Sequence, residues 1–138
     1  MVSGRSDANT GRIRLGMVGG GQGAFIGAVH RLAARMDDQY EFVAGALSAD
    51  AKKAKASGAD LGLAPDRIYT DFREMAKAEA KRADGIEAVS IVTPNNVHVP
   101  AAMAFIEAGI HVICDKPLAL NLKEAKALEK LLGRRKDV

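Results

Sequence analysis

A glycine-rich stretch, residues 13–30, constrains more than any other what this chain can fold into. It reads IRLGMVGGGQGAFIGAVH, so an apolar run typical of a strand leads into a cluster of glycines. Apolar residues then recur at helical spacing, which predicts a strand, a loop and a helix in that order. The N–H groups and positive dipole end of such a helix could hold an anion such as pyrophosphate against the glycine backbone. Glycine loops also end strands for purely structural reasons, so the remaining sequence has to decide between the two interpretations.

The rest of the chain alternates predicted strands and helices. Short apolar runs predict strands over 41–47, 87–92 and 110–114, with a short strand or extended segment over 67–70. Helices are predicted from Asp50 to about Gly62, over 72–80, over 97–108 and after Pro117. This order favours the α/β class, with a Rossmann-type, doubly wound parallel sheet and helices on both faces. Ligands of such sheets bind at the carboxyl ends of the strands.

Composition narrows the possible partners. The 138 residues are 48% hydrophobic and 27% charged, as in one soluble globular domain, which we expect over 12–138 after a flexible leader over 1–11. An aromatic share of 4% without tryptophan, and a net charge of +3, argue against a nucleic-acid partner. No apolar run approaches the roughly 18 residues that span a membrane, so no membrane partner is expected. The single cysteine, Cys114, excludes a disulfide framework and a thiolate metal cluster. We therefore expect no metal site and a reducing, cytoplasmic location.

The glycine loop contains a dinucleotide fingerprint of the form G-x-G-x-x-G/A. Gly19 would make the tight turn, Gly21 would admit the pyrophosphate, and Ala24 would pack the helix against the sheet. Gly27, about one helical turn further on, is the alternative for this packing position. The cofactor-binding residues expected in the loop are Gly19, Gly21, Gln22, Gly23 and Ala24.

The end of the second predicted strand bears on the choice between NAD and NADP. An acidic residue there accepts a hydrogen bond from the ribose 2′-hydroxyl of NAD, and it repels the 2′-phosphate of NADP. Here the position holds Ser48, with Lys52 and Lys53 just beyond. Asp50 could serve NAD instead, or it could simply cap the following helix while the lysines are solvated. We include Ser48 and Lys53 among the cofactor-binding residues and expect NADP or NAD, with NADP preferred.

Two further segments carry a resemblance to a known family. Residues 93–98 read TPNNVH, and residues 115–117, after another predicted helix and strand, read DKP. Together with the glycine loop and His30, they resemble the glucose–fructose oxidoreductase and inositol dehydrogenase family, Gfo/Idh/MocA, whose nucleotide-binding domain carries TPxxxH and EKP at these points. The resemblance covers residues 12–130, with Asp115 in place of the family's glutamate.

The resemblance implies roles for individual residues. Lys116 would be the catalytic residue, because its charge can hold the substrate oxygen and help its deprotonation next to the nicotinamide ribose. Asp115 would help to fix that ribose, and Pro117 would fix the loop that presents Lys116. The segment lining the nicotinamide half of the cofactor would contribute Thr93, Pro94, Asn95 and His98.

These side chains also have purely structural interpretations. A lysine before a proline at a strand end is commonly an exposed loop residue. His98 and His30 could be packing or capping histidines, and we interpret His30 and His111 in this way. Cys114 has the pattern of a buried strand cysteine, so we do not expect it to be reactive.

The resemblance implies a two-domain enzyme, of which this chain holds the cofactor half, truncated before the usual C-terminal α/β domain. We expect an NAD(P)-dependent dehydrogenase of a sugar- or cyclitol-like alcohol, catalytically incomplete in this chain alone. The full-length form is expected to be a homo-oligomer. An unpaired sheet edge predicts self-association or marginal stability of the chain itself.

Two other functions fit part of the sequence. A non-catalytic dinucleotide-binding or sensor module would bind the cofactor but would not need Lys116. A methyltransferase also has a glycine loop after its first strand, but that function leaves residues 115–117 unexplained.

Overall fold

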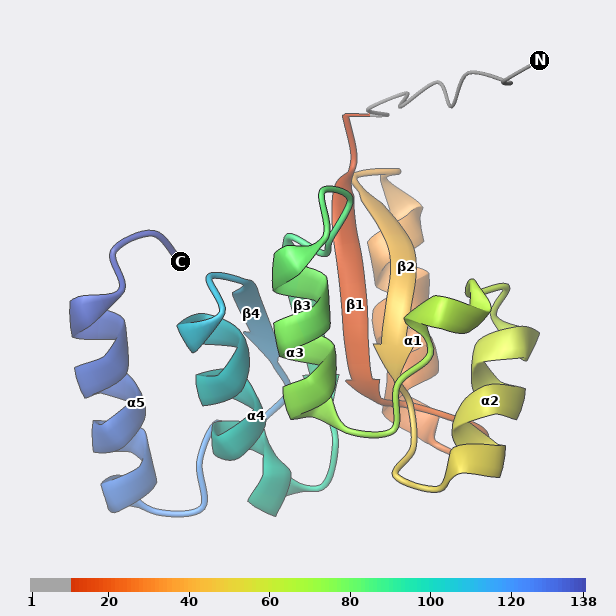
Figure 1. The fold of residues 1–138 in the computed structure, drawn as a ribbon. Coiled ribbons are helices and arrows are strands. Elements are labelled where there is room, and N and C mark those ends of the chain that lie inside the picture. The colour runs from red at the N-terminus through yellow and green to blue at the C-terminus, as the bar shows by residue number, and fades with distance from the viewer. Residues whose placement is uncertain (1–10) are drawn as a thin grey trace.

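Four parallel strands form one sheet in the order β2, β1, β3 and β4 (Figure 1). They are seen in a computed structural model that describes residues 11–138. The strands are β1 (Ile13–Gly19), β2 (Tyr40–Ala46), β3 (Ala88–Val92) and β4 (His111–Cys114). The parallel pairing confirms the predicted Rossmann-type α/β sheet. The leader predicted over 1–11 lies, apart from Gly11, outside the described residues.

Helices follow the strands in the predicted alternation. They are α1 (Phe25–Met36), α2 (Ala51–Asp60), the 3-10 helix η1 (Pro65–Arg67), α3 (Phe72–Lys81), α4 (Asn95–Glu107) and α5 (Leu122–Arg134). In the segment predicted over 67–70, Arg67 belongs to η1 and Ile68 makes an isolated parallel bridge with Gly45. Among the described residues, no helix is both long and apolar enough to cross a membrane.

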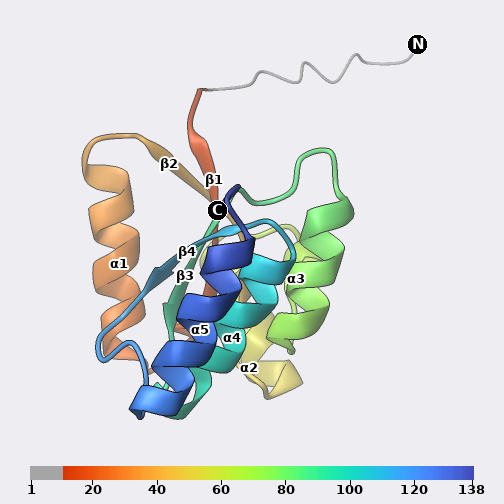
Figure 2. The same ribbon diagram turned by 90° about the vertical axis from the view of Figure 1, so that its left-hand side faces the viewer.

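The helices divide unequally between the two faces of the sheet. Figure 2 shows α1 on one face and α3, α4 and α5 on the other. Because successive residues of a strand point to opposite faces, Ile91 packs with Phe105 of α4 in the main core, whereas Val92 belongs to a second cluster. That second cluster contains Met17 of β1 and has Ile26 of α1 packed against it.

The α1 face leaves apolar side chains exposed. Phe25, Val29, Leu32 and Met36 form one stripe along α1 and are 82%, 43%, 57% and 81% exposed. Ile113 of β4 is 40% exposed beside α1 on the same face. The periodicity of α1 therefore predicts its helix correctly, but this stripe does not point into the core of residues 11–138. Contiguous exposed apolar side chains of this kind commonly mark contact surfaces.

A buried ion pair joins η1 to α3. Arg67 and Glu79 are 6% and 1% exposed, and the guanidinium donates to both carboxylate oxygens. Glu79 also accepts from the Tyr69 hydroxyl at 2.8 Å and from the Ile86 N–H at 3.1 Å. Burial, followed by the hydrogen bond to Glu79 and its charge, raises the pKa of Tyr69 to about 12, so the phenol remains a donor at neutral pH. This cluster fixes the connection between β2 and β3.

The replacement Glu79→Gln tests the contribution of this pair to stability. It removes the buried counter-charge of Arg67 and leaves the exposed Asp84 carboxylate, 3.7 Å away, as its partner, so we expect the free energy of unfolding to fall by about 3 kcal/mol. Urea unfolding followed by circular dichroism measures the change. Asp66→Asn, which removes an exposed partner of Arg82, serves as the matched control and should leave the midpoint nearly unchanged. Equal effects of the two variants would show that the buried pair has no special role.

Candidate functional site

The carboxyl ends of the strands meet at one edge of the sheet, where a cleft of about 530 Å³ opens. Its walls come from the loop after β1, the end of β2 with the start of α2, the segment before α3, and the end of β3. Small-molecule and cofactor sites commonly have this volume. The predicted site residues that line the cleft are Gly19, Gly21, Ala24, Ser48, Lys53, Thr93 and Pro94.

Hydrogen bonds to neighbouring elements hold the loop after β1 in place. The Gly21 N–H donates to the Leu47 carbonyl at the end of β2, at 3.2 Å. Arg31 of α1 donates to the Gly20 carbonyl at 3.0 Å. The sequence did not identify Leu47 or Arg31 as site residues. Each contacts the glycine loop only in the folded chain, and no sequence motif links either residue to the loop. The loop is therefore anchored on β2 and on α1.

Two predicted loop residues lie outside the cleft lining. The Gln22 side chain donates to Asp60 of α2 at 2.7 Å, and the Gln22 N–H donates to Ser57 Oγ at 2.9 Å. Gln22 and Gly23 line a separate hollow between the loop and α2. The structure thus places Gln22 against α2, where polar partners satisfy its amide.

Helix α1 begins directly on the loop because two glycines let the backbones touch. A Cβ added to Gly27 would lie 2.5 Å from the Cα of Gly20, and Gly20 has a φ of +74° that other residues rarely adopt. Ala24 is the exposed N-cap residue of α1. The packing role predicted for Ala24 therefore belongs to Gly27, the alternative that the sequence offered.

Two helices begin at the cleft without a side-chain cap. Side chains of Asp50, Asp71 and Asn121 accept from first-turn N–H groups of α2, α3 and α5. Within residues 11–138, no side chain caps α1 at Ala24 or α4 at Pro94, and neither helix has an acidic residue in its first turn. Both N-cap residues line the cleft. The positive dipole ends of α1 and α4 are therefore open to an anion there.

The end of β2 supplies two polar side chains. Ser48 and Lys53 line the cleft. Asp50 accepts from the Lys53 N–H at 2.7 Å and so caps α2, and it does not line the cleft. Of the two roles considered for Asp50, the structure supports the cap. Residues 70–72 also line the cleft and were missed, because Asp71 was recognised only as a cap for α3.

Thr93 directly follows β3, and over residues 11–138 its hydroxyl group lacks a hydrogen-bond partner. Its Oγ1 is buried and has no hydrogen-bond partner within the described residues, although Thr93 lines the cleft. Buried polar atoms nearly always have a partner, so this hydroxyl suits a polar group of a bound molecule. Asn95, two residues later, is exposed in the first turn of α4.

His98 does not line the cleft. Its ring is 1% exposed, and its two nitrogens face the carbonyl oxygens of Pro117 at 2.7 Å and Thr93 at 2.9 Å. The structure thus places His98 between the loops that follow β3 and β4. A ring in this position can act on the cleft only through these two loops.

The loop after β4 follows on the same edge, because β4 pairs with β3. Lys116 is exposed there, and Asp115 lies with its Oδ1 3.6 Å from His30 Nε2. His30 Nδ1 in turn lies 2.8 Å from Ser90 Oγ, so His30 contacts a predicted site residue as well as a buried strand residue. Burial, and to a lesser extent the Asp115 charge, raises the pKa of the Cys114 thiol, which agrees with an unreactive cysteine.

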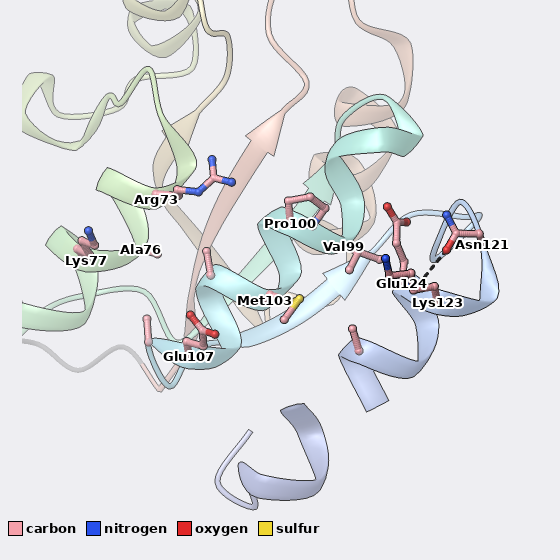
Figure 3. A pocket seen from close by; sticks show the side chains of 13 residues that line it. Arg73, Ala76, Lys77, Val99, Pro100, Met103, Glu107, Asn121, Lys123 and Glu124 are labelled. Carbon is pink, nitrogen blue, oxygen red and sulfur yellow. Dashed lines mark hydrogen bonds between the residues drawn. The ribbon is translucent and has the colours of Figure 1, made fainter. Parts of the chain in front are cut away.

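A larger hollow of about 800 Å³ lies elsewhere, between α3 and α5 with α4 as its floor (Figure 3). Figure 3 shows Met103 and Pro100 on α4, with Arg73 and Lys77 on the α3 side. None of the predicted site residues lines this groove. The cleft at the sheet edge is therefore the candidate site because predicted site residues line it, although its volume is smaller than that of the groove.

The relatives found by comparison with known proteins include oxidoreductases and an inositol dehydrogenase homolog. An uncharacterized oxidoreductase of Bacillus subtilis, YfiI, is 41% identical over 124 residues, which are 89% of this chain and 32% of that protein. The crystal structure of an oxidoreductase from Sinorhizobium meliloti is 64% identical with a TM-score of 0.85, over 90% of this chain and 34% of that one. An inositol dehydrogenase homolog from Azotobacter vinelandii, complexed with NADH and myo-inositol, is 43% identical with a TM-score of 0.87, over 91% and 33%.

The chain thus spans about a third of the length of the curated relatives it matches. Residues 13–138 match the family described as "Oxidoreductase family, NAD-binding Rossmann fold", GFO_IDH_MocA. The match includes every strand and helix of the fold as well as the cleft. The chain belongs to this family of NAD-binding oxidoreductases.

Proposed function

We propose that the protein is the nucleotide-binding part of an NAD(P)-dependent dehydrogenase that acts on a sugar- or cyclitol-like alcohol. The observation that carries the proposal is the pair of uncapped helices, α1 and α4, that open onto one cleft beside the glycine loop. Membership of an oxidoreductase family supports the reaction class. The cyclitol substrate class is suggested by the relative that was crystallised with myo-inositol.

The residues present fit a dinucleotide. The loop approaches its neighbours so closely that a Cβ on Gly21 would lie 2.6 Å from the Leu47 carbonyl oxygen, which leaves the wall of the cleft as bare backbone. Backbone N–H groups and helix dipoles can then bind a pyrophosphate. The unpartnered Oγ1 of Thr93 supplies a hydrogen-bonding group further along the same cleft.

In this proposal, the parts of the cofactor are held at different strand ends. Gly19 and Gly21 lie at the pyrophosphate, and Ser48 and Lys53 hold the ribose and the 2′-phosphate or 2′-hydroxyl of its adenosine half. Thr93, Pro94 and Asn95 lie toward the nicotinamide half, with Asp115 and Lys116 on the adjacent loop. The shape of the cleft supports this order, since it runs from the end of β2 past the glycine loop to the end of β3.

The proposed role of Lys116 follows from charge. In the oxidation, a bound oxidised nicotinamide would accept the carbinol hydrogen as a hydride, and the hydroxyl proton would leave to solvent water. The ammonium group of Lys116 would stabilise the negative charge that develops on the substrate oxygen and so lower the barrier to loss of that proton. Lys116 is exposed on the loop after β4, at the same edge of the sheet as the cleft, and this location supports the role.

Other features of the whole protein stay predictions. We propose that turnover requires the part of the longer relatives that lies outside the matched third. A homo-oligomeric full-length form and a cytoplasmic location are expected on the grounds given for the sequence. The exposed stripe of α1 supports the expectation that the isolated chain self-associates.

Calorimetric titration of the purified chain with NADH and NADPH tests the proposal. We expect binding of at least one of them, with a dissociation constant below about 1 mM, and NADPH ahead of NADH. Ser48→Asp should lower the ratio of NADPH to NADH affinity by at least about tenfold, because a carboxylate there repels the 2′-phosphate. Asp50→Asn, which keeps the cap of α2, is the control and should leave the ratio unchanged. The cofactor assignment fails if the wild-type chain binds neither nucleotide.

The replacement Gly27→Ala tests the seat of the pyrophosphate. The added methyl group meets the Gly20 backbone and pushes the loop away from α1. Overpacking of this kind costs about 1–3 kcal/mol, so we expect NADH affinity to fall about tenfold or more. Gly133→Ala, in α5 with no atom within 4 Å of the added Cβ, is the matched control. A Gly27→Ala variant that folds and binds NADH normally would remove this contact from the site.

The lysine is tested in a longer relative that carries the same Asp-Lys-Pro motif. There the change that corresponds to Lys116→Met removes the charge but keeps most of the side-chain length. We expect turnover to fall by at least about a hundredfold, with cofactor affinity within about threefold of the wild type. Steady-state kinetics and calorimetry measure the two effects. Retained turnover would make Lys116 an ordinary loop residue.

A further inference from the structure

His98 joins two loops that are far apart in the sequence and adjacent at the edge of the sheet. It lies in the first turns of α4, with its ring 1% exposed. One ring nitrogen lies 2.9 Å from the carbonyl oxygen of Thr93, at the end of β3. The other lies 2.7 Å from the carbonyl oxygen of Pro117, the residue that follows Lys116. Both polar atoms of this buried side chain are therefore directed at loop backbone.

The loop that carries Lys116 has few other attachments. At its start, the Asp115 N–H donates to the Ile91 carbonyl, and at its end the Leu120 N–H donates to Glu124. Between these two points, over residues 116–119, the bond with His98 is the one hydrogen bond found within the described part of the chain. Ala119 also packs against the main core, so loss of the His98 ring would leave residues 116–118 held mainly through their neighbours in the chain.

The geometry points to His98 as a positioning residue that holds the Lys116 loop against the end of β3. This inference rests on the role proposed above for Lys116. His98 does not line the cleft, so it acts through the backbone of Pro117 on one side and of Thr93 on the other. The same ring contacts the backbone of Thr93, which lines the cleft, and the backbone of the loop with the reacting lysine.

Chemistry decides which substitutions are informative. A neutral imidazole donates from one nitrogen at a time, and an imidazolium donates from both. Phenylalanine keeps a ring of similar size but has no donor. Asparagine places its amide N–H₂ group near the position of Nδ1, so it can keep the bond to the Pro117 carbonyl and loses the one to Thr93. Glutamine places its amide N–H₂ group near the position of Nε2, so it can keep the bond to the Thr93 carbonyl and loses the one to Pro117.

Hydrogen–deuterium exchange of the full chain tests the proposal without any cofactor. In His98→Phe and His98→Gln we expect exchange of the hydrogen-bonded amides of Asp115 and Leu120 to rise about tenfold, as for the loss of one hydrogen bond, while residues 19–24 stay as in the wild type. His98→Asn should restore most of the protection. His111→Phe, at an exposed histidine of β4, is the control and should change nothing over 115–120. If His98→Phe does not fold, the Asn and Gln pair makes the same comparison.

Nucleotide binding gives a second readout that a mere packing role would not move. We expect His98→Gln to weaken NADH about tenfold and to leave ADP, which lacks the nicotinamide half, within about twofold. Unchanged exchange over 115–120, or a rise spread equally over the whole sheet, would overturn the positioning role. So would equal losses for NADH and ADP. A wild-type chain that binds neither nucleotide would instead refute the proposed function, and the exchange result would still decide the role of His98.

Discussion

The backbone contact between Gly20 and Gly27 is the constraint on which the rest of the site depends. Because these two glycines touch, α1 begins directly over the end of β1, and its positive dipole end points at the loop. The same contact keeps the loop close enough to the end of β2 for the Gly21 N–H to donate to the Leu47 carbonyl. One contact without side chains therefore sets the packing of a helix and the shape of a cleft wall.

The α-helices over residues 11–138 differ in how the N–H groups of their first turns are satisfied. Asp50, Asp71 and Asn121 satisfy the first N–H groups of three helices and contribute to their stability. The helices that begin at Ala24 and Pro94 forgo this stabilisation, and both of them open onto the cleft. A bound anion would supply the missing interaction, so ligand binding and helix stability are coupled at these two positions.

Two buried polar side chains hold the connections between strands. Glu79 gathers Arg67, Tyr69 and the Ile86 N–H around the segment between β2 and β3. His98 lies between the loops after β3 and β4. Glu79 lies away from the cleft lining and serves stability, whereas His98 touches both loops that surround the predicted nicotinamide half. Glu79 contacts the segment that leads into β3, whereas His98 contacts the segments that follow β3 and β4.

The sequence by itself determined the order of strands and helices, the parallel α/β class and the edge at which the strand ends meet. These follow from local periodicity and from the right-handed connection between parallel strands, which the residues of each segment encode. Tertiary structure alone decided that Gly27 rather than Ala24 packs α1, that Gln22 turns to Asp60, and that the exposed stripe of α1 faces away from the core. It also decided that His98 lies beneath the cleft rather than in it. Their partners come from segments distant in the chain, and no local spacing specifies which of two faces or loops a side chain meets once the segments pack.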